Sequence, residues 1–327
     1  MIGAVALAAA VVVPCARNAV AWIGRPFAGV LFADNLIVVS IGRASWREPQ
    51  LRRAEWARIV AIDGTPVETA AAAHAAIERR GIGGEVTFTL RRGAELFRVR
   101  LPVVAFARRD FDEVFAPMLV MGVALMVMGT LLAWLRPALP EVRGLFAVCA
   151  SLGLMLVTGP DQYGPYRFTP LYLLAFASVP PAVFHLAATY PWRPGRWAGR
   201  AVVAAYALFA VIGALLIALR FDPQVFLLLL YLVYFALANA LLLYMGSLVG
   251  AFAVRRRPRA EISLALAAVL ASSGTGVVAM VTYPLLTEPI SAIWLIAPIA
   301  LLPILSGIAF VGLPSRAPRP GAAGETP

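Results

Sequence analysis

The residues that could do chemistry are few in this chain and stand far apart. Its 327 residues include two histidines, His74 and His185, and two cysteines, Cys15 and Cys149, which lie in separate apolar runs. A zinc site needs three or four such ligands, and two isolated cysteines suggest no disulfide or metal framework. A serine nucleophile in the small-residue run 272–276 would have only His185 as its base. We therefore expect no catalytic residue, no bound metal and no cofactor.

Two polar side chains fall inside apolar runs that are long enough to cross a membrane. His185 lies near the end of one run, and Asn239 lies in the middle of another. An ionisable group in a bilayer suggests a functional site, but a neutral histidine can also hydrogen-bond a neighbouring helix or reach lipid headgroups. Asn239 has the same two interpretations, a sensing role or a helix–helix hydrogen bond. The run 272–276, rich in serine and glycine, suits close helix packing.

These residues must be positioned by helices, because the composition is that of a membrane protein. Hydrophobic residues make up 61% of the chain and charged ones only 14%, against about 25% charged in a soluble domain. Residues 1–22 contain an apolar opening that we interpret as an uncleaved signal anchor. Seven later runs approach the roughly 20 residues that cross a bilayer, at about Val114–Leu135, Gly144–Thr158, Pro170–Pro191, Ala201–Leu219, Val225–Val249, Ile262–Leu285 and Ser291–Leu313. We expect an α-helical polytopic membrane protein with about eight transmembrane helices.

The arginines predict how these helices are oriented. Eleven arginines lie in alternate loops and the C-terminal tail, whereas the opposite loops hold only Arg167 and Arg220. Because basic loops stay in the cytoplasm, residues 24–107 should face outward. The seven-helix bundle, 114–313, should then end in a short cytoplasmic tail, 314–327. The 28 basic residues, against 17 acidic ones, are in this interpretation a topology signal near membrane lipid and not a nucleic-acid surface.

Residues 58–101 form the one long segment that is not membrane-like. Arg58–Asp63 predicts a strand, which an Asp-Gly turn follows. Thr69 can cap a helix over Ala70–Arg80, and glycines stop that helix. Two strands with alternating apolar residues come next, at about 86–90 and 97–101. The segment is therefore expected to be a small α+β domain.

This order of strand, turn, helix and hairpin, with the motif IxxIDGxPV at 59–67, resembles a bacterial PDZ domain. The resemblance implies a domain over 24–107 in which an extended peptide binds beside the helix. It also implies a strand at 29–32 next to the helix and a second strand over Leu36–Ile41. The implied peptide groove consists of Phe27, Gly29, Val30, Phe32, Ala70 and His74. His74 either borders that groove or is a solvated surface residue.

An anchor, an outward PDZ-like domain and seven helices together resemble the input half of bacterial sensor histidine kinases of the competence-pheromone type. In such kinases the last helix leads into a cytoplasmic catalytic module, whereas the 327 residues here contain no kinase domain. The resemblance implies a non-catalytic signal-input or interaction module in the bacterial inner membrane. It would take a peptide or protein ligand outside and act through a membrane or cytoplasmic signalling partner.

Two other functions stay open. A PDZ-type adaptor in extracytoplasmic protein quality control would use the same groove, and a membrane enzyme or transporter is the third possibility. An intramembrane zinc protease does not fit, because His185 is followed by no H-E-x-x-H pattern. The loop 159–170 carries Tyr163, Tyr166 and Arg167. These side chains form either a lip against the PDZ-like domain or a ligand, or an interfacial aromatic anchor.

Overall fold

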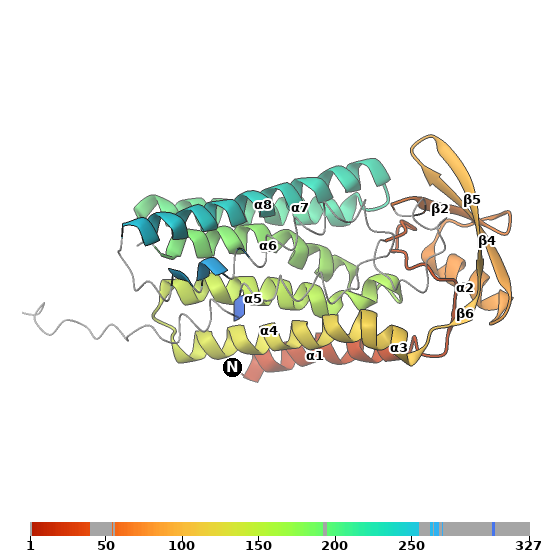
Figure 1. Cartoon of the computed structure of the whole chain (residues 1–327), viewed down its shortest axis with the longest axis horizontal. Coiled ribbons are helices and arrows are strands. Elements are labelled where there is room, and N and C mark those ends of the chain that lie inside the picture. The colour runs from red at the N-terminus through yellow and green to blue at the C-terminus, as the bar shows by residue number, and fades with distance from the viewer. Residues whose placement is uncertain are drawn as a thin grey trace, which may run out of the picture.

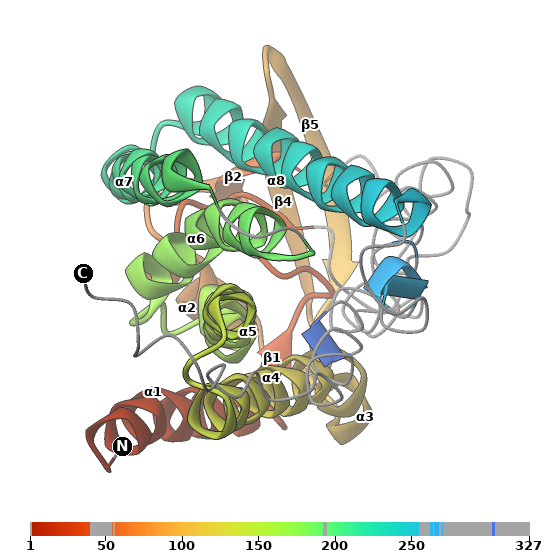
Figure 2. The same cartoon turned by 90° about the vertical axis from the view of Figure 1, so that its left-hand side faces the viewer.

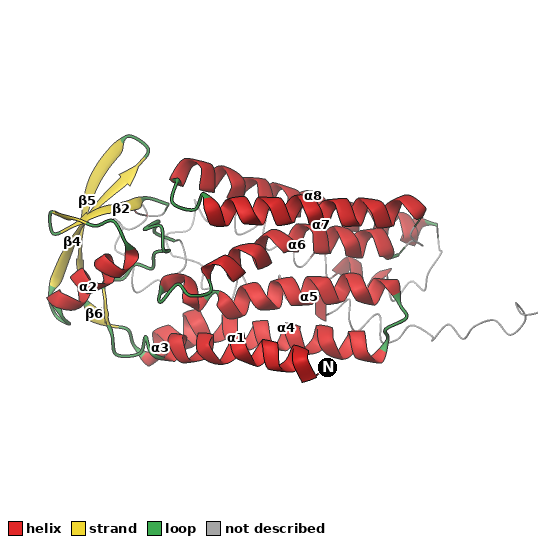
Figure 3. Cartoon of the chain, turned by 180° about the vertical axis from the view of Figure 1, so that it is seen from behind, coloured by secondary structure: helices red, strands yellow, loops and turns green. Residues whose placement is uncertain are grey.

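The computed structural model describes residues 2–39, 54, 56–191 and 195–254, together with positions 262, 263, 265–267, 270, 303 and 304. Long helices run side by side as a bundle, and a small β-sheet region lies at one end of it (Figure 1). The same division is visible from behind, with the strands gathered at that end (Figure 3). We call it the sheet end of the bundle.

Six long helices form the bundle in the described residues: α1 (Ile2–Val20), α4 (Ala116–Leu135), α5 (Pro140–Thr158), α6 (Thr169–Thr189), α7 (Arg196–Ala218) and α8 (Pro223–Ala253). A short helix α3 (Arg108–Asp110) and a π-helical turn (Phe111–Phe115) lead into α4, and a 3-10 turn (Pro160–Tyr163) follows α5. Viewed along the bundle, α6 lies between α5 and the pair α7 and α8 (Figure 2). The central position of α6 makes it the helix that joins the two sides.

Five stretches of helix in the described residues are long and apolar enough to cross a membrane: Arg108–Leu135, Pro140–Tyr163, Thr169–Thr189, Trp197–Ala218 and Pro223–Ala253. This agrees with the predicted membrane protein. The five stretches coincide with the first five runs predicted after the sheet region. Helix α1 contributes a shorter apolar stretch, Ala10–Val20. The last two predicted runs, 262–285 and 291–313, lie outside the described residues except at single positions, so the count of eight spans stays a prediction.

Four of the predicted helices begin earlier in the structure than their apolar runs do, among them α6 at Thr169 instead of Pro170 and α7 at Arg196 instead of Ala201. Helix α5 starts at Pro140 instead of Gly144, since proline is well suited to the first turn of a helix. Helix α8 starts at Pro223 because the Asp222 carboxylate caps it, accepting from the next two free backbone N–H groups at 3.0 and 3.2 Å. Polar and proline residues at a helix start are invisible to a search for apolar runs.

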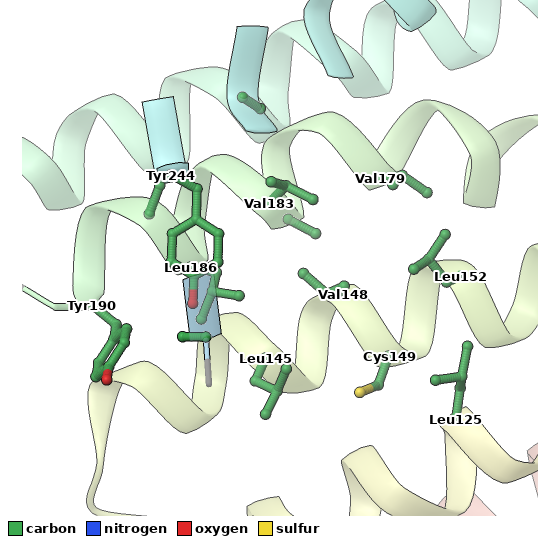
Figure 4. Close-up of a cluster of buried hydrophobic side chains, with 14 of the residues drawn as sticks. Leu125, Leu145, Val148, Cys149, Leu152, Val179, Val183, Leu186, Tyr190 and Tyr244 are labelled. Carbon is green, nitrogen blue, oxygen red and sulfur yellow. The ribbon is translucent and has the colours of Figure 1, made fainter. Parts of the chain in front are cut away.

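The core of the bundle forms where α4, α5, α6 and α8 face one another. Figure 4 shows its buried side chains, among them Leu125, Leu145, Val148, Cys149, Leu152, Val179, Val183, Leu186, Tyr190 and Tyr244. Glycines bring α4 and α5 close together: a Cβ at Gly153 would lie 2.6 Å from Met126 Cγ and 2.8 Å from the Gly122 carbonyl oxygen. Small residues at such contacts are typical of helix packing in membranes.

The described residues between 24 and 107, here called the sheet domain, contain a four-stranded antiparallel sheet. Its strand order is β3-β2-β4-β5, with β2 (Arg58–Ile62), β3 (Thr65–Pro66), β4 (Glu85–Arg92) and β5 (Glu95–Pro102). Phe88 of β4 pairs with Val99 of β5, and both side chains are buried. The alternation that predicted these two strands is the pattern of their buried face.

Helix α2 (Ala70–Arg80) packs on this sheet and has the predicted bounds. Its side chains Ala73 and Ile77 belong to the same core as the sheet residues. At its start, the Thr69 hydroxyl accepts from the Ala72 N–H at 3.2 Å, so the predicted N-cap is confirmed. The predicted strand, helix and hairpin of the segment 58–101 are therefore all present.

The segment before β2 differs from the prediction. The expected strands at 29–32 and Leu36–Ile41 are absent from the described residues there, which make only isolated bridges. Strand β1 (Pro26–Phe27) pairs instead with β6 (Val104–Ala105). Leu36 has a φ of 66°, a left-handed conformation that interrupts an extended chain. The chain turns at Asp34 and Asn35, just before the expected second strand, and Val38 then forms only an isolated antiparallel bridge with Phe32.

Candidate functional site

The strongest candidate site is the contact between the sheet domain and the sheet end of the bundle, and His74 lies in it. His74 Nε2 is 2.9 Å from the Tyr166 hydroxyl and 3.1 Å from the Tyr163 carbonyl oxygen. The Tyr166 hydroxyl in turn donates to the Phe32 carbonyl oxygen at 3.2 Å. Because carbonyl oxygens only accept, one arrangement satisfies all three contacts. His74 Nε2–H donates, and Tyr166 accepts from it while donating to Phe32.

The His74 ring is mostly enclosed by aromatic side chains. It stacks on Phe32 with ring centroids 4.5 Å apart and meets Trp22 edge-on at 5.6 Å. This burial, with the nearby charge of Arg25, lowers the pKa of His74 to about 4 despite the bond to the Tyr163 carbonyl. His74 is therefore a neutral hydrogen-bond donor at pH 7, and the surface alternative for this residue is wrong.

A second contact joins the sheet domain to the turn between α7 and α8. Arg220 Nε lies 2.9 Å from Asp34 Oδ2, and the Asn35 side-chain amide donates to the Arg220 carbonyl oxygen at 2.9 Å. Burial raises the pKa of the Asp34 carboxyl, and the bond to Arg220 opposes that rise. An ion pair with both side chains partly buried resists solvent screening better than an exposed one. Arg220, assigned to the topology signal from its sequence position, thus also anchors the sheet domain.

A third set of hydrogen bonds, made by Asp161, fixes the conformation of the connection between α5 and α6. Asp161 is fully buried. One of its carboxylate oxygens accepts from the Asn18 amide of α1 at 3.2 Å and the other from the Phe168 N–H at 2.6 Å. The Tyr166 N–H donates to the Asp161 carbonyl oxygen at 3.1 Å. This connection therefore presents Tyr166 to the sheet domain in a fixed position.

The predicted groove residues are only partly brought together. Phe32 and His74 face each other directly, and Val30 and Ala70 are buried in the same core. Phe27 belongs to a different cluster with Trp22, Phe106, Phe115 and Tyr163. Gly29 lies between Ala28 and Val30, which both belong to the sheet-domain core, and has a φ of 74° that favours glycine. The hydroxyl of Tyr166, in the loop 159–170, bonds to both His74 and the Phe32 carbonyl oxygen. The loop therefore lies against the sheet domain, which was the first of its two interpretations.

The two polar residues inside the bundle make modest contacts. His185 on α6 lies with Nδ1 3.5 Å from the Tyr206 hydroxyl of α7, and their rings meet edge-on. This geometry fits the helix–helix interpretation. The Asn239 amide donates to the Phe235 carbonyl oxygen of its own helix at 2.7 Å. That bond stays within α8 and joins no second helix.

No group of three or more metal-ligating side chains occurs in the part of the chain that the structure describes. The small-residue run 272–276 lies outside that part. Sequence reasoning missed the roles of Trp22, Asp34, Asp161 and Arg220, because each depends on a partner far away in the chain. The aromatic composition of the loop 159–170 was the one available signal.

Comparison with models of protein families, with curated proteins and with solved structures finds no match for this chain. Its function must therefore be argued from the contacts between the sheet domain and the helices.

Proposed function

We propose that this chain is a non-catalytic membrane signal-input or interaction module. The sheet domain, taken as PDZ-like, would receive a peptide or protein ligand, and the helices would carry the change to a signalling partner. The observation that carries the proposal is the double contact of the sheet domain with Arg220. The Arg220 side chain pairs with Asp34, and the Arg220 carbonyl oxygen accepts from Asn35. Because Tyr166 binds the same domain from the α5–α6 connection, one small domain holds the ends of two helix pairs.

This arrangement supports a mechanical route for a signal. A ligand that shifts the sheet domain would move Arg220 and Tyr166, and with them the ends of α5 to α8. Helices are stiff, and α8, with 31 residues, is about 45 Å long, enough to cross the bilayer. A shift at the sheet end would thus reach the opposite end. A partner there responds only if its affinity differs between the two arrangements.

The proposed location is a bacterial inner membrane with the sheet domain outside, which rests on the asymmetry of the loop arginines. The β4–β5 hairpin gives a place to test it, because Gly93 lies in an exposed turn. A periplasm-active reporter inserted at Gly93 should be active, and the same reporter fused after Pro327 should be silent. The opposite pattern would contradict the orientation.

The signalling route can be tested by measuring distances at the end of the bundle away from the sheet domain. Spin labels on cysteines at Ala138 and Val254, both exposed, report the separation of the α4–α5 turn from the end of α8. The background variant carries Cys15→Ala and Cys149→Ala, which remove the two free cysteines. The full chain is studied in lipid nanodiscs by pulsed electron resonance.

The test compares two arginine variants. Arg220→Ala removes the side-chain grip on Asp34, whereas Arg98→Ala changes an exposed arginine on β5 and serves as the matched control. Arg220→Ala should shift or broaden the distance distribution, and Arg98→Ala should leave it unchanged. Identical distributions in all three proteins would mean that the sheet domain is a passive cap, and the proposed function would then be wrong.

A further inference from the structure

The face of the sheet domain beside α2 carries a tyrosine that comes from the bundle. The Tyr166 ring packs against the sheet-domain core and lies 6.0 Å from the His74 ring, centroid to centroid. Its hydroxyl bonds to both His74 Nε2 and the Phe32 carbonyl oxygen. The Tyr166 side chain therefore joins His74 of α2 to the backbone of Phe32.

The connection between α5 and α6 holds Tyr166 there in an unfavourable backbone conformation. Tyr166 has a φ of 67°, in the left-handed region that residues other than glycine rarely adopt. Strained conformations of this kind persist only where surrounding contacts fix them. Here the contacts are those of Asp161 with the backbone N–H groups of Tyr166 and Phe168.

We propose that Tyr166 is an internal occupant of the ligand face, so that this face accepts an external peptide bearing a tyrosine only when Tyr166 leaves it. This inference rests on the proposed function, because it assumes that the sheet domain is the part that receives the ligand. Binding and release of the domain from the α5–α6 connection are then one event. The tyrosine of the ligand competes with Tyr166 for the same position.

The chemistry of the site selects tyrosine over phenylalanine. The Phe32 carbonyl oxygen accepts from the Tyr166 hydroxyl, and His74 Nε2–H donates to that hydroxyl as well as to the Tyr163 carbonyl oxygen. A hydroxyl group supplies both the donor and the acceptor, whereas a phenyl ring supplies neither. A polar group left unsatisfied after burial weakens binding by about tenfold. The ligand class is therefore a peptide with an accessible tyrosine side chain.

The internal tyrosine has a large advantage over an external one. A tethered group competes at an effective concentration in the millimolar range. A weakly binding peptide would therefore hardly bind the wild-type chain, because Tyr166 occupies the site most of the time. Loss of Tyr166 leaves the site free in every molecule and should raise the apparent affinity for the peptide by at least about tenfold.

The test uses the full chain in nanodiscs and a labelled peptide with the sequence of residues 159–170, GPDQYGPYRFTP. Tyr166→Ala should bind this peptide at least about tenfold more tightly than the wild type by fluorescence anisotropy. Tyr231→Ala, which removes an exposed tyrosine on α8, is the matched control and should bind like the wild type. The same peptide with phenylalanine in place of its second tyrosine should bind Tyr166→Ala about tenfold more weakly.

A second variant guards against a folding defect in Tyr166→Ala. Tyr166→Phe keeps the ring and loses the hydroxyl, so it should also bind the tyrosine peptide more tightly than the wild type. If neither variant gains affinity, Tyr166 is not an occupant of a ligand face. If the phenylalanine peptide binds as well as the tyrosine one, the assignment of the ligand class is overturned. The proposed function is judged separately, since the distances measured in Arg220→Ala do not involve this peptide.

Discussion

Acidification should loosen the sheet domain from the bundle through His74. The ring is neutral, stacked on Phe32 and close to the charge of Arg25, so a proton added to it would create a poorly solvated second charge. Its pKa falls from 6.5 to about 4 in the folded chain. The undocked or unfolded state therefore binds more protons between these two values. Stability must fall as the pH drops from about 6.5 to about 4 and change little from this source outside that window.

The size of the effect follows from the same two values. A pKa lower by about 2.5 corresponds to about 3 kcal/mol in full, of which about 2 kcal/mol should be lost between pH 7 and pH 5. Asp34 acts in the opposite direction: burial raises the pKa of its carboxyl, so proton uptake there favours the docked state as the pH falls toward 4. The His74 contribution must therefore be isolated by difference.

Hydrogen exchange of α2 and β4, corrected for the intrinsic pH dependence of exchange, measures the free energy of local opening. The comparison is between the wild type and His74→Gln, whose side-chain amide keeps an N–H donor and does not titrate. The wild type should lose about 2 kcal/mol of protection from pH 7 to pH 5, and His74→Gln should lose much less. Equal pH dependence in both proteins would refute the account of His74 as a partly buried neutral donor.

Three further substitutions test the contacts that shape the fold. Thr69→Ala removes the N-cap of α2 and should cost about 1 kcal/mol of sheet-domain stability, measured by the same exchange experiment. Gly153→Ala puts a Cβ 2.8 Å from a backbone oxygen of α4 and should lower the midpoint of thermal unfolding by several degrees. Gly246→Ala is the control and should leave that midpoint unchanged, because its Cβ would meet nothing within 4 Å. Arg220→Gln should cost about 1–2 kcal/mol by leaving the partly buried Asp34 carboxylate without its counter-ion, seen as faster exchange near β2.

Local sequence patterns predicted those parts of the fold whose cause is local. The helix Ala70–Arg80 was found with its bounds because Thr69 and the following glycines act on the residues beside them. The hairpin was found because alternation records which face is buried. Leu36 shows the limit of this reasoning. A leucine with a φ of 66° is set by its surroundings, and no local preference predicts it. The strand expected over Leu36–Ile41 is therefore absent at 36–39, the part of that range that the structure describes.

The candidate site could not be assembled in the same way, because its partners are distant in sequence. His74 meets Tyr163 and Tyr166 across about ninety residues, and Asp34 meets Arg220 across 186. On its own helix, His74 lies among alanines and resembles a surface residue. Only the aromatic loop supplied by the bundle makes it a partly buried donor. The sequence therefore indicated both His74 and the aromatic loop 159–170 as candidates but left open whether they are in contact. Burial of a polar side chain depends on the assembled fold and not only on the helix that carries it.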